Sequence, residues 1–436
     1  MSALAEVRLW GARLGGVFLP EQGGGASFEY DPSFAASGLE VAPLRMPLAS
    51  GITYRFGELI RTSFEGLPGL LSDSLPDRYG NALIDAWLAT VGRTPESFDV
   101  VERLCYVGSR GMGALQFRPA LGPESPESES VDLEALIELA SELLAARGSL
   151  RVDLQRPDRK RALEEILRVG SSAGGARAKA LIAFDSETGE VRSGQLGAPP
   201  GFRHWILKFD GVSDRRREIG SLVGYGAIEY VYAELAARAG IEMTECRLLE
   251  EGGRRHFMTR RFDRTDDGGR VHMQSLAALA HLDYELAGAH SYEQAFEVIR
   301  RLRLTMHERE QMFRRAAFNV IARNQDDHVK NIAFIMDQTG AWSLAPAFDL
   351  VYAFNPEGRW TAHHQMSING KLDDFRVEDL RHLAASAGLR RGRDSELLGE
   401  VTEAVASWPE QAAATGIETE RIEAIAATHR LELGRS

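Results

Sequence analysis

Apolar and polar residues alternate with a period of two in several short runs of the first 260 residues. Residues 5–30 contain E-V-R-L-W, V-F-L and S-F-E-Y, which predict a small antiparallel sheet. Further strands are predicted at 114–119, 180–184 and 204–210. Residues 246–249 and 256–259 flank Gly252-Gly253 and predict a β-hairpin.

Apolar residues at spacings of three and four predict helices between these strands and throughout the last third of the chain. Residues 312–323 form the clearest example, because their apolar positions define one stripe. One further helix is predicted to begin after Pro76. Others are predicted near residues 96–106, 132–147, 158–167, 223–238, 377–387, 396–414 and 418–433.

A second hairpin is predicted directly after helix 312–323. Residues 332–336 are apolar and form the first strand, residues 337–340 are turn residues, and residues 341–345 form the returning strand. Antiparallel pairing would set Asn331 roughly opposite Pro346. Asp349 would then lie close to Asn331 although the two are distant along the chain.

The chain of 436 residues is long enough for two or three subdomains. Residues 121–131 are acidic and rich in Pro and Ser, and predict a linker. We therefore expect an N-terminal subdomain over 1–120, a second part over 132–262 and a helical part over 263–436.

Composition excludes some classes of function. A net charge of −12 argues against a broad basic nucleic-acid surface. Cys105 and Cys246 lack metal-ligand spacing and fit reduced thiols in a cytosolic protein. No apolar run is long enough to span a bilayer, so we expect a cytoplasmic protein without membrane contact.

The densest candidate chemistry lies in N-Q-D-D-H-V-K-N, residues 324–331. Asp326 and Asn331 have the offset of the base and the metal-binding Asn in a protein-kinase catalytic loop. Phe348-Asp349-Leu350 resembles the metal-binding D-F-G that follows. We predict Asp326 as base and Asn331 and Asp349 as metal ligands. Asp327 is a competing base, and a solvated turn would also use these residues.

Two earlier segments carry further candidates. Gly174 and Gly175 permit backbone angles that form an anion-binding nest, but Ala176 stands where a Walker A motif needs Lys. Lys208 lies in strand 204–210 on the face opposite Trp205, Leu207 and Phe209. It matches the strand lysine of kinases, and the following helix offers Glu229 or Glu234 as its partner.

The longer motifs resemble the HipA family, the serine/threonine kinase toxins of bacterial toxin–antitoxin modules. These motifs are N-x-D-x-H-x-K-N, L-A-P-A-F-D-L, L-P-G-L-L-S-D-S-L-P-D-R-Y-G-N and G-S-R-G-M-G-A-L. The resemblance implies an α+β, bilobal, protein-kinase-like fold with an N-terminal antiparallel-sheet lobe and a largely helical C-terminal lobe. It also implies ATP, Mg²⁺ and a protein substrate.

The resemblance also implies residue roles. S-x-A-G-G-A-R-x-K is the family's loop over the nucleotide phosphates, with an autophosphorylated Ser that aligns with Ser172 and leaves Ser171 as the alternative. Glu229 is favoured over Glu234, although Ile228 replaces the family's Asn. We assign Asp326, Lys208 and His328 to catalysis. The nucleotide-binding candidates are Ser172, Gly174, Gly175, Ala176, Arg177, Lys179, Lys208, Glu229, Met258, Arg260, His328 and Lys330.

The family further implies a small helix-turn-helix antitoxin dimer as partner, which joins the toxin to operator DNA. Several members phosphorylate aminoacyl-tRNA synthetases and so stop translation. Two other hypotheses stay open. One is a metal-dependent phosphohydrolase that uses Asp326, Asp327, His328 and His363. The other is a catalytically degenerate protein recruited to DNA by a partner. Separately, His363 and His364 could ligate a metal ion with His328 as a third ligand.

Overall fold

The protein is described by a computed structural model over residues 4–21, 23–121, 137, 140, 178–194, 198–212 and 223–434. The chain forms two compact units. Unit 1 comprises Met1–Arg216, Leu249–Gln274 and Met336–Ala341; unit 2 comprises Arg217–Leu248, Ser275–Ile335 and Trp342–Ser436. No helix in the described ranges is long and apolar enough to cross a membrane.

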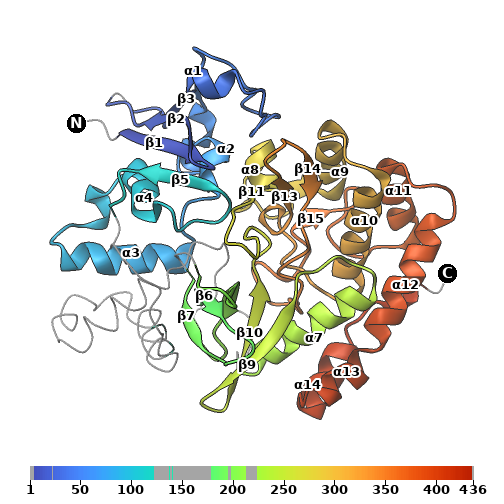
Figure 1. Ribbon diagram of the computed structural model, residues 1–436. Coiled ribbons are helices and arrows are strands. Elements are labelled where there is room, and N and C mark those ends of the chain that lie inside the picture. Colours follow the sequence, from blue (N-terminus) through green and yellow to red (C-terminus); the bar gives the residue numbers. More distant parts are fainter. Residues whose placement is uncertain are drawn as a thin grey trace. The chain divides into compact units, whose positions relative to one another are not determined.

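Unit 1 begins with an antiparallel sheet of order β4-β3-β2-β1-β5 (Figure 1). Its strands are β1 (Leu4–Leu9), β2 (Ala12–Phe18), β3 (Ser27–Tyr30), β4 (Thr53–Arg55) and β5 (Leu115–Arg118). Alternate residues of β1 are buried, as the period of two predicts. The short helices α1 (Pro32–Ala35) and α2 (Gly69–Ser72) lie in the connections.

A second sheet in unit 1 has the order β7-β6-β8-β10-β9. Its strands are β6 (Lys179–Phe184), β7 (Val191–Ser193), β8 (Arg203–Lys208), β9 (Cys246–Glu251) and β10 (Arg254–Arg260). The predicted hairpin around Gly252-Gly253 is therefore confirmed. The short strand β11 (His272–Ser275) follows later in the chain.

Two helices of the N-terminal region belong to the same core as the second sheet. Asp77 caps α3 (Arg78–Thr90), and Asp99 and Glu102 form a capping box on α4 (Val100–Val107). The shared core joins side chains of both helices to one face of β6, β8 and β10. It includes Leu83, Leu88, Tyr106, Ile182, Trp205, Leu207 and Met258.

Unit 2 is mainly helical. Its helices are α7 (Tyr225–Arg238), α8 (Leu276–Ala280), α9 (Tyr292–Arg301), α10 (Met306–Ile321), α11 (Val377–Ala387), α12 (Arg393–Ala406), α13 (Trp408–Ala414) and α14 (Thr419–Ala426). Helix α10 contacts α9, α11 and α12. Its predicted stripe is buried at Phe313, Ala316, Ala317, Val320 and Ile321.

The helices predicted over 396–414 and 418–433 differ from those observed. The first is broken at Ser407, because Pro409 begins a new helix as one of the first two residues of α13. The second ends at Ala426, and a 3₁₀ turn over Leu431–Gly434 follows. The α+β class predicted from the sequence is confirmed, with antiparallel sheets in unit 1 and helices in unit 2.

The predicted second hairpin is formed by β13 (Ala333–Met336) and β14 (Trp342–Leu344), and the Ala345 N–H donates to the Ala333 carbonyl. In the same region β12 (His290–Ser291) pairs in parallel with β15 (Met366–Ser367).

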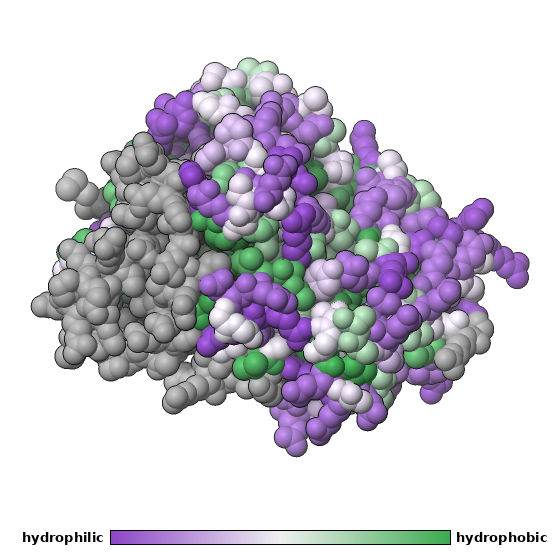
Figure 2. All heavy atoms as spheres, turned by 60° about the horizontal axis from the view of Figure 1, so that its bottom comes forward, coloured by the Kyte–Doolittle hydropathy of each residue, from purple (hydrophilic) through white to green (hydrophobic). Residues whose placement is uncertain are grey.

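Hydrophilic residues cover much of the face in Figure 2, with smaller groups of apolar residues between them.

Candidate active site

The polar loop 324–331 directly follows the buried helix α10. Thr305 and Glu308 form a capping box at the start of this helix, and Ala322 ends it. Arg323 then takes a positive φ of 59°, a conformation that turns the chain out of the helix. The loop is therefore held at the end of a rigid, packed element.

The two adjacent aspartates of the loop have opposite environments. The Asp326 side chain is 53% exposed, and its Oδ1 lies 4.0 Å from Nε2 of His328. The Asp327 side chain is fully buried and accepts hydrogen bonds, among them one from the Tyr292 hydroxyl at 2.8 Å. Only Asp326 is open to an incoming substrate, which favours it over Asp327 as the base.

His328 and Lys330 both lie against Tyr284. The ring centres of His328 and Tyr284 are 5.8 Å apart, and Nζ of Lys330 lies 4.8 Å from the Tyr284 ring centre. A cation over an aromatic face is attracted by the ring quadrupole. Tyr284 thus orients two side chains that follow Asp326 in the sequence.

Hydrogen bonds connect both predicted metal ligands, Asn331 within the loop and Asp349 beyond the hairpin, to other loop residues. Nδ2 of Asn331 donates to the Asp326 carbonyl at 2.8 Å, so its Oδ1 is the atom suited to a cation. Nδ2 of Asn324 lies 3.3 Å from the Asp349 carbonyl and donates to it. Asn324 and Ala353 form a parallel bridge, so the chain after Asp349 runs beside the loop.

The donor set of Asn331 and Asp349 fits Mg²⁺. Both side chains offer hard oxygen ligands, and Mg²⁺ in nucleotide sites typically takes one or two protein ligands with phosphate oxygens. Within the part of the chain that the structure describes, no group of three or more His, Cys, Asp or Glu residues could hold a metal ion alone. Asp349 has a positive φ of 55°, an uncommon conformation that clusters at functional sites.

The histidine and aspartate set of the phosphohydrolase hypothesis is not gathered around one point. His363 has a side chain that is 67% exposed, and its Nδ1 lies 3.7 Å from Asp373. His364 is fully buried, and its Nδ1 lies 2.8 Å from Asp327. The two adjacent histidines therefore face different carboxylates, and Asp327 is already occupied by internal donors.

The candidates in unit 1 lie on the second sheet. Lys208 in β8 is directly opposite Lys179 in β6, and both are buried. Nζ of Lys179 forms an ion pair with Asp77 at 3.2 Å, while Nζ of Lys208 lies 5.6 Å from the Phe257 ring centre. Two like charges on one face repel, and Asp77 offsets the charge of Lys179.

The remaining candidates occupy three further places. Met258 in β10 is buried in the core of unit 1, and Arg260 pairs with the exposed Asp266. Glu229 is buried in α7 of unit 2. Ser171, Ser172, Gly174, Gly175, Ala176 and Arg177 lie outside the described residues, as do the predicted linker beyond Leu121 and the predicted helices 132–147 and 158–167, apart from Ile137 and Ala140.

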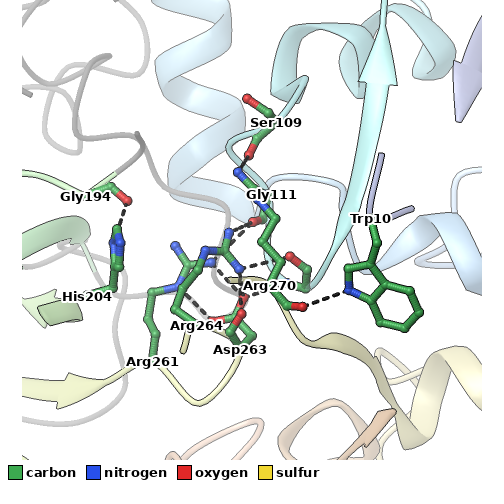
Figure 3. A network of polar contacts seen from close by, with 10 residues as sticks. Trp10, Ser109, Gly111, Gly194, His204, Arg261, Asp263, Arg264 and Arg270 are labelled. Atoms are coloured by element: carbon green, nitrogen blue, oxygen red, sulfur yellow. Dashed lines mark hydrogen bonds and ion pairs between the residues drawn. The ribbon is translucent and has the colours of Figure 1, made fainter. Parts of the chain in front are cut away.

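A buried ionic network follows β10 and was not predicted (Figure 3). Asp263 is fully buried and accepts from Nε and Nη2 of Arg261 at 2.8 and 2.7 Å and from Nη1 of Arg264 at 2.8 Å. The Gly113 N–H also donates to it, at 2.6 Å. Burial alone would raise the pKa of Asp263, but the two arginines hold it well below its ordinary value.

This network joins the end of β10 to the glycine-rich loop before β5. Nη2 of Arg264 donates to the Gly111 carbonyl at 3.0 Å, and Nη2 of Arg270 donates to the Ser109 carbonyl at 2.6 Å. The string R-F-D-R was the available signal in the sequence. Its partners are about 150 residues earlier in the chain, so no spacing rule could have identified them.

The structure defines an α+β protein in which the loop after the buried helix α10 carries an exposed Asp326 and is hydrogen-bonded to the backbone of Asp349. Residues 5–118 match the family model described as the HipA N-terminal domain, and residues 171–408 match the HipA-like C-terminal domain. The chain belongs to the HipA family.

Named relatives agree with this assignment. The Sinorhizobium fredii protein "Putative kinase Y4mE" is 24% identical over 434 residues, which cover 95% of this chain and 94% of that protein. "Putative kinase Y4dM" from the same organism is 27% identical over 198 residues, 42% of this chain and 46% of that protein. The fold is similar to a chain in the Shewanella oneidensis complex of HipA, HipB and operator DNA, with a TM-score of 0.67, 16% identity and coverage of 99% and 96% of the two chains.

Proposed function

We propose that this protein is a serine/threonine protein kinase that depends on ATP and Mg²⁺. One observation carries the proposal: Asp326 is exposed, and hydrogen bonds connect its loop to both proposed metal ligands. The Asn331 side chain donates to the Asp326 carbonyl, and the Asn324 side chain donates to the Asp349 carbonyl. This is the set of groups that phosphoryl transfer requires. The relatives named as kinases support the same reading.

Magnesium-ATP, when bound, supplies the phosphoryl group. Asp326 orients the incoming hydroxyl and accepts its proton. Asn331 and Asp349 would hold the metal through their side-chain oxygens. Lys208 would bind phosphate oxygens with Glu229 as its partner, Lys330 would add positive charge near Asp326, and the His328 imidazole would offer a hydrogen-bonding nitrogen beside it. The segment with Met258 and Arg260 would contact the adenine, and Lys179 would support the phosphate loop.

Regulation by self-modification is part of the proposal. Ser172, or its neighbour Ser171, would accept a phosphoryl group and thereby silence the enzyme. Ser172→Ala should still phosphorylate a substrate and should keep its activity after prolonged incubation with ATP. Loss of all substrate phosphorylation in this variant would indicate a structural role for the hydroxyl.

We also propose that the protein is the toxin of a toxin–antitoxin module. Its partner would be a small HipB-like antitoxin with a helix-turn-helix fold, and its substrate a protein such as an aminoacyl-tRNA synthetase. The solved relative assembles with HipB and operator DNA. A net charge of −12 favours DNA contact through the partner, because DNA repels an acidic surface. The expected cytoplasmic location fits this role.

The test is the intact mass of dephosphorylated protein after incubation with Mg²⁺ and ATP, beside Asp326→Ala treated identically. A gain of phosphoryl groups in the wild type alone, mapped to Ser172 or Ser171, is the expected result. If neither protein gains mass, phosphorylation of candidate substrates and nucleotide titration come next. Absence of both transfer and nucleotide binding would contradict the kinase function.

A further inference from the structure

Asp327 is a buried carboxylate beside an exposed one. Its residue exposure is 3%, whereas the neighbouring Asp326 side chain is 53% exposed. A carboxylate that is removed from water is destabilised unless hydrogen bonds replace its hydration. Asp327 therefore needs its partners, and their positions depend on it.

Three donors from two separate segments meet at this carboxylate. The Tyr292 hydroxyl donates to Oδ2 at 2.8 Å, Nδ1 of His364 donates to the same oxygen at 2.8 Å, and the Gln365 N–H donates to Oδ1 at 2.7 Å. Tyr292 begins α9, and Gln365 precedes β15. Burial and the Asp327 charge raise the pKa of Tyr292, so its hydroxyl keeps the proton that it donates.

The hydrogen bonds continue from Asp327 to the predicted metal ligand. The Tyr292 hydroxyl also accepts from Nδ2 of Asn319 at 2.9 Å. Oδ1 of Asn319 accepts from Nδ2 of Asn324 at 2.9 Å, and the same Nδ2 contacts the Asp349 carbonyl at 3.3 Å. One continuous network thus connects the residue after the base with the residue that would hold Mg²⁺.

We propose that Asp327 is a positioning residue. It fixes the backbone of Asp326 and holds Asp326 at a constant position relative to Asp349. The proposal rests on the kinase function proposed above. Because Asp327 anchors the peptide that it shares with Asp326, Asp326 can adjust only through its own side-chain torsions. A displacement of about 1 Å at a reacting group can cost about 100-fold in rate.

Asp327→Asn is the decisive variant. Asparagine keeps an acceptor for the Gln365 N–H, but its amide nitrogen cannot accept from Tyr292 and His364. We expect kcat to fall about 100-fold and the KM for ATP to rise by a smaller factor, since the loop carries the base but only part of the proposed nucleotide contacts. Tyr292→Phe removes one donor only and should give a smaller loss of kcat.

Asp379→Asn is the matched control. Asp379 is 2% exposed and also accepts three hydrogen bonds, from Nδ2 of Asn369 at 2.8 Å, Nζ of Lys371 at 2.7 Å and the Arg376 N–H at 2.8 Å. It lies in α11 of the same unit. Its variant should lose thermal stability as Asp327→Asn does, but kcat should stay within about twofold of wild type.

Hydrogen exchange of residues 324–331 separates this proposal from the kinase function. Asp327→Asn should speed exchange in this loop, and Asp379→Asn should not. If kcat and loop exchange of Asp327→Asn match those of the wild type, or if Asp379→Asn loses kcat equally, the positioning role is wrong. If the wild type transfers no phosphoryl group, the kinase function fails, and the exchange comparison alone decides whether Asp327 holds the loop.

Discussion

At the scale of single residues, burial distinguishes groups that the sequence leaves equivalent. Asp326 and Asp327 are chemically identical neighbours, yet one is exposed and the other accepts three internal hydrogen bonds. A carboxylate can act as a base toward an external hydroxyl only if the hydroxyl can reach it. The proposed base and the buried residue proposed to support it are therefore adjacent in the sequence.

Asp326→Ala should abolish phosphoryl transfer and leave nucleotide binding intact. Removal of a positioned general base lowers rates by about 10²- to 10⁴-fold, and the Asp326 side chain has no role in the proposed metal site. We expect transfer to fall at least about 100-fold, with the Kd for magnesium-ATP within about threefold of wild type. Radiolabel transfer and calorimetric titration measure the two quantities, and a large loss of affinity would contradict this role.

Asp349→Ala should weaken magnesium-dependent nucleotide binding as well as transfer. The carboxylate is one of only two protein ligands proposed for the metal, so its removal leaves Asn331 alone. ATP affinity should become nearly independent of Mg²⁺ concentration. Titrations with and without Mg²⁺ test this, with Asp337→Ala in the exposed hairpin turn as a control. Tight, magnesium-dependent binding by Asp349→Ala would overturn the assignment.

The sequence could nominate Asp326, Asn331 and Asp349 as candidates because kinase loops impose a fixed local offset. It could not identify Asp327 as a buried anchor, because Tyr292 and His364 lie 35 and 37 residues away and share no pattern with it. From the sequence, Lys179 was predicted only as part of the loop over the nucleotide phosphates, and its burial was not predicted. Its ion pair with Asp77 joins segments that are separated by about 100 residues.

At the scale of elements, periodicity predicted the helices and strands that form within one segment. Contacts between distant segments could not be predicted in this way. The stripe on α10 and the hairpin of β13 and β14 follow from apolar spacing. The break at Ser407 follows from one proline inside a continuous helical pattern. The Asp263 network was missed, because it joins the end of β10 to a loop distant in sequence.

Asp263→Asn should destabilise unit 1 strongly. The substitution leaves Arg261 and Arg264 without a carboxylate, and breaking one buried ion pair typically costs about 3–5 kcal/mol. We expect a lower urea midpoint for the transition of unit 1. Asp266→Asn is the control, since Asp266 is 57% exposed in its pair with Arg260 and should change little. Equal midpoints for the two variants would show that the network does not hold this element.

At the scale of the whole molecule, the buried His204 and His272 and the half-buried His429 have pKa values below the ordinary value of histidine. Burial, together with Arg261 and Arg264, lowers the pKa of His204 to about 4. Burial lowers the pKa of His272 to about 4 and, with a contribution from Arg323, that of His429 to about 4. Both units contain such a group. The unfolded chain binds these protons near pH 6.5, the ordinary pKa of histidine.

The free energy of unfolding should therefore fall as the pH drops from about 6.5 to about 4. In that window the unfolded chain binds more protons than the folded protein, and each imidazole contributes up to about 1 kcal/mol per pH unit. Urea unfolding at several pH values measures the slope. His272→Gln can keep a donor toward the Val41 carbonyl, 3.1 Å from Nε2 in the native protein, but cannot titrate. This variant should lose one histidine's share of the slope; an unchanged slope would show that His272 titrates normally in the folded protein.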